Sequence, residues 1–569
     1  MAERKDGFLA KLLERTGMVK AEQVPVILAR APETDGGVIA ATVSVTGASE
    51  EDFLRKLAPM IGMKYVDLTE VKPEKETILR LPARLVFQYN VVPVSLQPDL
   101  IEIATSDPFN TGMADGLRLG VGMPVRLLLA PREEIGKFAR KHYGVGADTL
   151  DQLMQDGSLE ADVDTDFSKT DLSELGQEAS IVRFVNQIIA EADRQGATDI
   201  HFEPMEDELR IRYRIDGILH KVDMPPQLNR LQAAITSRLK VMANLDIAEK
   251  RMPMDGRIGI RVNGEDLDIR VSTMPTAYGE SVSLRLLQKS GNMVKLADLG
   301  MQPDDEALIT KLIHRPNGII LVTGPTGSGK STSLYSFLHE INTMDVRILT
   351  AEDPIEYEMP GINQVAVKSD IGLTFARILR AFLRQDPDIV MVGEIRDAET
   401  AEIAINASLT GHLVLSTLHT NDSAGAFARL VDMGVEPFLV ASAVSGVLAQ
   451  RLIRRLCVHC RRQEPIGEKR IRQFGLDAAG WTADMPVFEP AGCEKCGNTG
   501  FRGRGGIFEL LPVTEAIESM IIAHRPSSDI RHKAIEDGMH TLREDGWRSV
   551  QIGRTTIGEV LRVTEDSES

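Results

Sequence analysis

The C-terminal half of the chain alternates between short runs of wholly apolar residues and segments whose apolar residues recur at helical spacing. The alternation begins near Gly300. Strands that are apolar on both faces and lie between helices are typical of a parallel sheet covered by helices on both sides. The sequence therefore predicts an α/β domain, with strands at 318–323, 347–350, 389–392 and 413–417.

Two smaller modules of mixed helix and strand pattern precede this domain. In the first, over residues 50–146, helical spacing alternates with β-rich runs, and in the second a helical pattern comes before strand-like runs. Both modules are therefore predicted to be α+β. The predicted helices are 51–61, 132–143 and 181–195, and the predicted strands are 89–94, 99–105, 199–202, 208–215, 257–262 and 267–272.

A strongly acidic segment separates the two modules. Residues 148–178 hold ten Asp and Glu residues against one lysine, so they carry −9 of the net charge of −18. A stretch with so few apolar residues does not bury enough surface to order itself, which predicts a flexible linker. The expected domains are 1–147, 179–290 and 291–569.

Composition narrows the classes of protein that fit. The chain has 569 residues, and its 83 Asp and Glu against 65 Lys and Arg disfavour a general nucleic-acid binder. The longest apolar run, 438–449, is shorter than the roughly 18 residues of a spanning helix, and the N-terminus has no signal-peptide pattern. We expect a cytoplasmic protein without a transmembrane segment, which reaches a membrane only through partners.

A phosphate-binding loop follows the first strand of the large domain. The stretch Gly324-Pro325-Thr326-Gly327-Ser328-Gly329-Lys330-Ser331 fits G-x-x-x-x-G-K-[ST], and a helical run over 333–341 follows. Together with Thr332, these residues are the expected nucleotide-binding set. Glycines let backbone N–H groups wrap the phosphates of ATP, the lysine reaches the β- and γ-phosphates, and the serine hydroxyl ligates Mg²⁺. The motif predicts an ATP site with Lys330 and Ser331 at its centre.

Acids and histidines follow later strands of the same sheet. Glu394 comes directly after the strand 389–392, and Glu356 closes the cluster Glu-Asp-Pro-Ile-Glu that starts at Glu352. A carboxylate at such a place holds Mg²⁺ or orients the attacking water. His412 and His419 bracket the strand 413–417, and we expect them at the nucleotide edge of the sheet, where they would sense the γ-phosphate.

The order of these motifs resembles the type II/type IV secretion ATPases, the assembly motors of type II secretion systems and type IV pili. The matching stretches are the phosphate loop, EDPIEY, LRQDPDIVMVGEIRD and TGHLVLSTLHTN, together with ATDIHFEP and RMPMDGR upstream. The resemblance spans about residues 180–515. It implies a RecA-like P-loop core of parallel strands with helices on both faces, preceded by a PAS-like α+β domain and a small α+β N-terminal domain.

The resemblance also implies roles for individual residues. Glu356 matches the glutamate that activates water, Glu394 matches the acid that, with Ser331, holds Mg²⁺, and His412 and His419 match the histidine-box pair. Family members are hexamers that bind nucleotide between the PAS-like and RecA-like domains, where arginines complete the site. The arginines at matching positions are Arg257, Arg270, Arg380 and Arg384.

All four cysteines fall in two CxxC pairs. Cys457 and Cys460 form one pair, Cys493 and Cys496 the other, and 32 residues separate the pairs. Two such pairs predict a closed tetrahedral Zn²⁺ site that is structural rather than catalytic, at the base of an insertion over 451–506. In the resembled family, the tetracysteine pattern marks export and pilus-assembly motors and is absent from retraction motors.

Two branches of the family remain open, and the residues around the histidine box favour the type II secretion ATPase over the pilus-extension ATPase. By resemblance, the partners are an inner-membrane secretion platform and a membrane-anchored docking protein that binds the N-terminal domain. A cyclic-dinucleotide sensor is the alternative for that domain, although Phe8–Gly17 lacks the expected Arg-Leu-Gly opening. A RecA-type nucleic-acid motor would share the phosphate loop, but the charge balance and the other motifs disfavour it.

Overall fold

The computed structural model describes residues 2–143 except 33, 35 and 36, and residues 172–564 except 225, 263, 289–293, 475 and 477–479. The chain divides into two compact units, Met1–Gln288 and Lys289–Ser569. Among the described residues, no helix is both long and apolar enough to cross a membrane. Most of the expected acidic linker, 148–171, lies outside the described residues.

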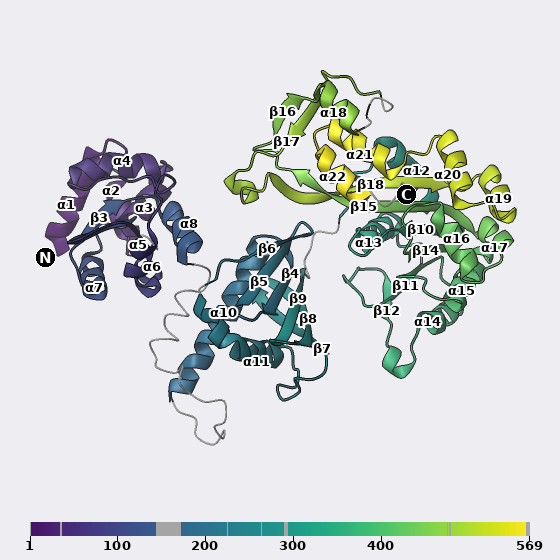
Figure 1. The fold of residues 1–569 in the computed structure, drawn as a ribbon, viewed down its shortest axis with the longest axis horizontal. Helices are drawn as coiled ribbons and strands as arrows, with labels where there is room; N and C mark the ends of the chain where they lie inside the picture. The colour runs from purple at the N-terminus through teal and green to yellow at the C-terminus, as the bar shows by residue number, and fades with distance from the viewer. Residues whose placement is uncertain are drawn as a thin grey trace. The chain divides into compact units, whose positions relative to one another are not determined.

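The first unit begins with a helical cluster and a three-stranded sheet (Figure 1). Leu13, Ile27 and Phe53 are buried and form the core of the helical cluster. No helix before residue 50 was predicted from the sequence pattern. The sheet has the order β1-β2-β3, with β1 and β2 antiparallel and β2 and β3 parallel. The elements are α1 (Ala2–Arg15), α2 (Val24–Arg30), α3 (Gly37–Thr46), α4 (Glu50–Met60), α5 (Lys75–Arg80), α6 (Ala83–Tyr89), β1 (Val91–Gln97), β2 (Leu100–Thr105), α7 (Thr111–Val121), β3 (Val125–Leu129) and α8 (Arg132–Tyr143).

The second part of this unit is a six-stranded antiparallel sheet of order β6-β5-β4-β9-β8-β7. Helices α10 and α11 pack on one face around buried Phe184, Ile188 and Leu239. Helix α10 starts at Leu172, so the last seven residues of the expected linker belong to it. The elements are α10 (Leu172–Arg194), β4 (Ala197–Pro204), β5 (Leu209–Ile215), β6 (Ile218–Lys221), α11 (Gln232–Met242), β7 (Met254–Val262), β8 (Glu265–Thr276) and β9 (Gly279–Gln288).

The second unit is built on a seven-stranded sheet of order β12-β11-β13-β14-β10-β15-β18. All neighbours are parallel except β15 and β18, which confirms the predicted mixed α/β core. The strands are β10 (Gly318–Thr323), β11 (Ile348–Glu352), β12 (Asn363–Ala366), β13 (Ile389–Val392), β14 (Leu413–Leu418), β15 (Val444–Leu456) and β18 (Phe501–Pro512).

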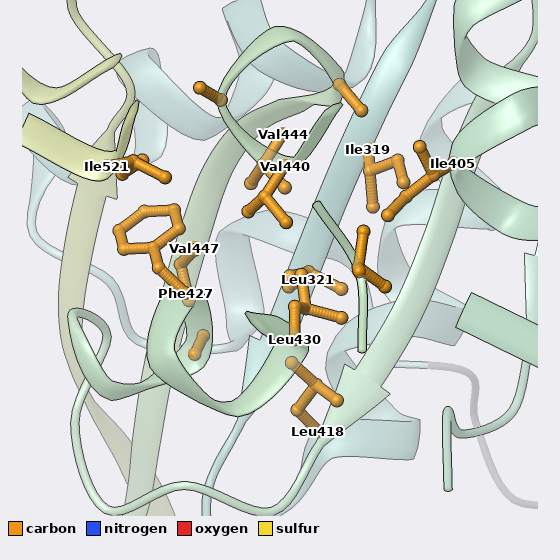
Figure 2. Close-up of a cluster of buried hydrophobic side chains, with 14 of the residues drawn as sticks. Ile319, Leu321, Ile405, Leu418, Phe427, Leu430, Val440, Val444, Val447 and Ile521 are labelled. Atoms are coloured by element: carbon orange, nitrogen blue, oxygen red, sulfur yellow. The ribbon is translucent and has the colours of Figure 1, made fainter. Parts of the chain in front are cut away.

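Helices cover both faces of this sheet. On one face, Ile319, Leu321 and Val447 of the strands pack against Phe427 and Val440 of the helices (Figure 2). On the other face, α12 and α13 enclose a second apolar core. The helices are α12 (Pro303–Ile313), α13 (Lys330–Ile341), α14 (Phe375–Phe382), α15 (Ala398–Leu409), α16 (Gly425–Asp432), α17 (Pro437–Ala443), α19 (Glu515–Ile522), α20 (Ser527–Glu536), α21 (Leu542–Gln551) and α22 (Ile557–Thr564).

An insertion interrupts the antiparallel pair β15 and β18. It contains the short hairpin β16 (Arg462–Pro465) and β17 (Pro486–Glu489), and helix α18 (Gly467–Phe474). The pairing of β15 with β18 continues to Leu456 and Phe501, so the cysteine pairs lie where this long ladder ends. The insertion therefore begins a few residues later than the expected 451.

Candidate nucleotide site and cysteine cluster

The phosphate loop connects the end of β10 to the start of α13. Two of its glycines have positive φ and no room for a side chain. A Cβ on Gly324 would lie 2.6 Å from the carbonyl oxygen of Gln450, and one on Gly329 would lie 2.6 Å from the Gln450 side-chain amide. The loop therefore packs tightly against β15, and a side chain at either position would displace it.

Lys330 begins α13 and folds back over the loop. Its Nζ donates to the carbonyl oxygens of Gly324 at 2.8 Å and Pro325 at 3.1 Å. Burial lowers the pKa of this lysine, and the nearby charge of Glu394 opposes that shift. Ser331 and Thr332 are exposed on the first turn of the helix, as are Pro325, Thr326 and Gly327 of the loop, whereas Ser328 is buried.

Glu394 follows β13, at the same edge of the sheet. Burial would raise the pKa of its carboxyl, but hydrogen bonds from Arg396 and His419 outweigh burial and hold the pKa below its ordinary value. His419 Nε2 lies 3.4 Å from Glu394 Oε2. Glu394 therefore remains a carboxylate near Lys330, as a group that holds a cation must.

A second acid, Glu352, ends β11 and is buried within a network of hydrogen bonds. Thr350 Oγ1 donates to it at 2.7 Å and Gln364 Nε2 at 2.9 Å, and the Tyr335 hydroxyl donates to its second oxygen. The loop behind Glu352 carries half-buried Glu356. The two acids of this cluster therefore differ: Glu352 is held inside the fold, and Glu356 is on the loop.

Several residues that the motifs did not single out form hydrogen bonds between segments at the phosphate-loop edge of the sheet. The hydroxyl of Thr323, at the end of β10, lies 2.6 Å from the Thr420 hydroxyl behind β14. Ser333 of α13 donates to Gln450 Oε1 at 2.7 Å, and buried Arg451 donates to the Asn421 carbonyl at 2.8 Å. These contacts join the phosphate loop to the segments behind β14 and β15, and each depends on strand order, which no local pattern reveals.

The structure separates the two histidines that were expected together. Gly318, the first residue of β10, pairs with Leu413, while the last residue, Thr323, pairs with Leu418. His412 therefore lies at the amino end of β14, on the edge opposite the phosphate loop, where its Nδ1 lies 2.8 Å from the Ala407 carbonyl oxygen. His419 alone is at the nucleotide edge, so the expected position of His412 was wrong.

Arg380 and Arg384 also lie away from the phosphate loop of their own chain. Arg380 of α14 pairs with Glu399 at 2.7 Å, and Arg384 Nη1 donates to the Arg380 carbonyl at 2.7 Å. The next residue, Gln385, accepts from Arg347 just ahead of β11. Arg384 therefore lies toward the amino end of β11, whereas Arg380 is held by the first turn of α15.

Arg257 and Arg270 belong to the first unit. They are direct register partners on β7 and β8, and Arg270 pairs in turn with Arg285 of β9. Residues paired across neighbouring strands point to the same face, so the three form a basic row. The row lies opposite the face that packs on α10 and α11, because Ile269 and Val271, the neighbours of Arg270 along β8, belong to that core.

The four cysteines converge in space. All four Sγ atoms lie within 4.8 Å of one another, and three of their pairs, Cys457 with Cys493, Cys460 with Cys496 and Cys493 with Cys496, are 3.8 Å apart. A tetrahedron of sulfur ligands about 2.3 Å from a central Zn²⁺ has edges of about 3.8 Å. The spacing therefore fits a tetrathiolate zinc site.

The electrostatics of the cluster fit a cation as well. Burial opposes ionisation of Cys496, but the N–H groups of Cys493 and Gly500, each 3.2 Å from its Sγ, bring its pKa down to about 6. Burial and hydrogen bonds to the other thiols raise the pKa of Cys460 to about 12. A second thiolate is therefore costly beside the first unless a cation neutralises both.

A family model described as Type II/IV secretion system protein matches residues 174–562, more than half of the chain. The chain belongs to this family. A second model, the MshEN domain, matches residues 61–149. Family membership confirms that the chain is a P-loop ATPase, with ATP as its nucleotide.

Two relatives match this ATPase almost from end to end. Type II secretion system protein E of Xanthomonas campestris pv. campestris is 41% identical over 563 residues, covering 98% of this chain and 97% of the relative. Type IV pilus assembly ATPase PilB of Myxococcus xanthus is 40% identical over 568 residues, covering 98% of each. The solved ATPase DotB of Yersinia pseudotuberculosis has the same fold, with a TM-score of 0.50 and 19% identity over 71% of this chain and 97% of that one.

Proposed function

We propose that this ATPase powers a type II protein secretion system from the cytoplasmic face of the inner membrane. The supporting observation is its identity of 41%, along 98% of its length, with a type II secretion system protein E. Deletion of the gene should then abolish export of secreted proteins across the outer membrane and leave surface pili in place. Export assays and pilus counts on the same strain test this.

The second candidate is assembly of type IV pili. Its support is the 40% identity with the Myxococcus pilus assembly ATPase, over the same share of the chain. If pilus assembly is the function, the deletion strain should lose pili and keep protein export. The two outcomes are opposite, so a single strain distinguishes the candidates.

In the catalytic site, Lys330 and the backbone N–H groups of Gly324–Ser331 hold the phosphates of ATP. Ser331 and Glu394 hold Mg²⁺, which neutralises phosphate charge when bound. Glu356 accepts a proton from the water that attacks the γ-phosphate. The carboxylate state of Glu394 and its charge interaction with Lys330 support this arrangement.

Arginines and further subunits complete the site. We assign Arg257 and Arg270 to the phosphates because they lie side by side on the polar face of the first unit's sheet. The active form is a homo-hexamer. His412 is not assigned to the site of its own chain, because it lies at the opposite edge of the sheet. Arg380 and Arg384 are not assigned to that site either, because their guanidinium groups bind Glu399 and the Arg380 carbonyl.

The cysteine cluster binds Zn²⁺ as a structural metal. Four thiolates close the tetrahedron, so the ion has no open position for chemistry and instead stabilises the insertion. The N-terminal domain docks to a membrane-anchored partner of the secretion platform, which brings a chain without a spanning helix in its described residues to the membrane.

Lys330→Ala tests the catalytic assignment. Removing the charge that faces the phosphates should lower kcat for ATP about 100-fold, while circular dichroism remains unchanged. Lys311→Ala, an exposed lysine on α12, is the matched control and should keep wild-type turnover. Normal turnover in a folded Lys330→Ala variant would refute the assignment.

A further inference from the structure

Tyr335 connects the phosphate-loop helix to the loop that carries Glu356. It lies on α13, five residues after Lys330, and its side chain is buried. Its hydroxyl donates to Glu352 and accepts from the N–H groups of Glu356 at 3.2 Å and Tyr357 at 3.4 Å. A phenol has one proton to donate and two lone pairs, so all three are used here.

The donor and acceptor roles are fixed by the neighbours. Glu352 accepts from Tyr335 on one oxygen and already accepts from Thr350 and Gln364 on the other. The two backbone N–H groups only donate. The Tyr335 hydroxyl therefore donates to the acid that ends β11 and accepts from the backbone on both sides of the Glu356–Tyr357 peptide bond.

The loop is also held from its far side. Gln364 Nε2 donates to the Tyr357 carbonyl at 2.8 Å, and its Oε1 accepts from the Met359 N–H at 2.7 Å. The rings of Tyr335 and Tyr357 meet edge to face, with centroids 5.6 Å apart. These contacts limit the conformations of the backbone from which the Glu356 side chain extends.

We propose that the Tyr335 hydroxyl is a positioning group that fixes the loop carrying Glu356 relative to the nucleotide-binding helix α13. The inference rests on the proposed function of Glu356 as the proton acceptor. Because Lys330 and Tyr335 share one helix, movement of the phosphate loop carries the anchor of the Glu356 loop with it. The Tyr335 side chain thereby couples phosphate binding to the placement of Glu356, the proton acceptor.

The test is Tyr335→Phe in the full chain, which removes one oxygen atom and keeps the ring. Loss of the anchor should lower kcat about ten-fold, the equivalent of one or two hydrogen bonds, while the dissociation constant for ATP stays within about two-fold of wild type. Tyr357→Phe is the matched control, since the Tyr357 hydroxyl makes no hydrogen bond among the described residues. It should retain wild-type kcat.

A double-mutant cycle with Glu356→Gln decides whether Tyr335 acts through Glu356. If it does, Tyr335→Phe lowers kcat in the wild-type background and has little further effect in the Glu356→Gln background. An equal loss in both backgrounds, or a loss of ATP affinity that matches the loss of kcat, overturns the positioning role.

The cycle also separates this inference from the proposed function. Wild-type kcat in Glu356→Gln refutes Glu356 as the base, and the positioning role with it. A strong effect of Glu356→Gln together with wild-type kcat in Tyr335→Phe refutes the positioning role alone. If Tyr335→Phe does not fold, Gln364→Leu releases the same loop from its other side, with reduced kcat expected and wild-type kcat contradicting the proposal.

Discussion

His419 Nε2 lies 3.4 Å from Glu394 Oε2, so the histidine behind β14 and the acid behind β13 meet at one edge of the sheet. Arg396 donates to the other oxygen of the same carboxylate. Although burial favours the protonated acid, these two donors favour the carboxylate more strongly and lower the pKa of Glu394. The groups around this acid therefore determine the pH range in which it is charged.

Arg396→Gln should move the acid limb of the pH–rate profile to higher pH. The carboxylate is the active form and is lost as pH falls through its pKa. Without the guanidinium that lowers this pKa, the carboxylate should become protonated, and kcat should fall, at a pH about one unit higher. The measurement is kcat for ATP between pH 4.5 and 8.

The control for this profile is Arg472→Gln, which removes an exposed arginine paired with Glu468 on α18. It changes the net charge by the same amount and should leave the acid limb in place. An unchanged limb in Arg396→Gln would contradict the assignment of this limb to Glu394.

Glu559 joins α22 to β15, and its substitution should destabilise the C-terminal unit. Its buried carboxylate accepts from the Arg454 backbone at 3.0 Å and from the guanidinium groups of Arg454 and Arg562. Burial raises the pKa, but these donors outweigh it and hold the pKa at about 2. Glu559→Gln should cost about 3 kcal/mol of unfolding free energy at pH 7.

The pH dependence of this effect has a defined sign. A depressed pKa stabilises the fold above the ordinary value near 4.5, and the stabilisation is lost as pH falls toward 2. The difference in Tm between wild type and Glu559→Gln should therefore narrow from pH 5 to pH 3. Glu468→Gln, in an exposed pair, should shift Tm little at any pH.

Removal of the metal from the cysteine cluster should destabilise the insertion locally. Binding to four thiolates contributes folding free energy, so Cys457→Ser with Cys460→Ser should lower Tm and expose 457–500 to proteolysis. Basal ATPase activity should survive in part, because none of the contacts described around the phosphate loop involves a cysteine. Elemental analysis that finds less than about half a zinc per chain would count against the site.

The local pattern of apolar residues was sufficient to predict much of the secondary structure of the large domain. The strands predicted at 318–323 and 389–392 have these bounds in the structure, because each is a continuous apolar run ended by glycine or charge. By contrast, β12 at Asn363–Ala366 is a partly exposed strand with no such run, and it was missed.

The site was less predictable than the strands. A six-residue strand spans about 20 Å, so His412 and His419 had to fall on opposite edges, which the shared motif obscured. Tyr335 occupies an ordinary core position in a helical pattern, and only the fold shows what its hydroxyl contacts. In both cases the missing information was the three-dimensional order of the strands.

Truncated chains separate the contributions of the first unit to ATP hydrolysis from its contributions to export. Helix α10 starts at Leu172 and packs on the six-stranded sheet through Phe184 and Ile188, so a chain that begins near residue 165 keeps this domain whole. A start near Leu175, which the linker prediction favoured, would remove part of the helix. The longer chain should oligomerise and hydrolyse ATP without the N-terminal domain, but it should not restore export in cells.

A chain that begins at residue 294 keeps the phosphate loop, Glu356 and Glu394 but lacks Arg257 and Arg270. If these arginines stabilise charge on the transferred phosphoryl group, its turnover should be at least about 100-fold below that of the longer chain. Both are compared at matched protein concentration, with ATP binding as the check on folding. The longer chain carrying Arg257→Gln and Arg270→Gln should reproduce the defect, whereas Arg261→Gln, an exposed neighbour on β7, should not. Equal turnover in the two truncated chains would make the second unit alone the catalytic unit and assign the arginine pair no part in hydrolysis.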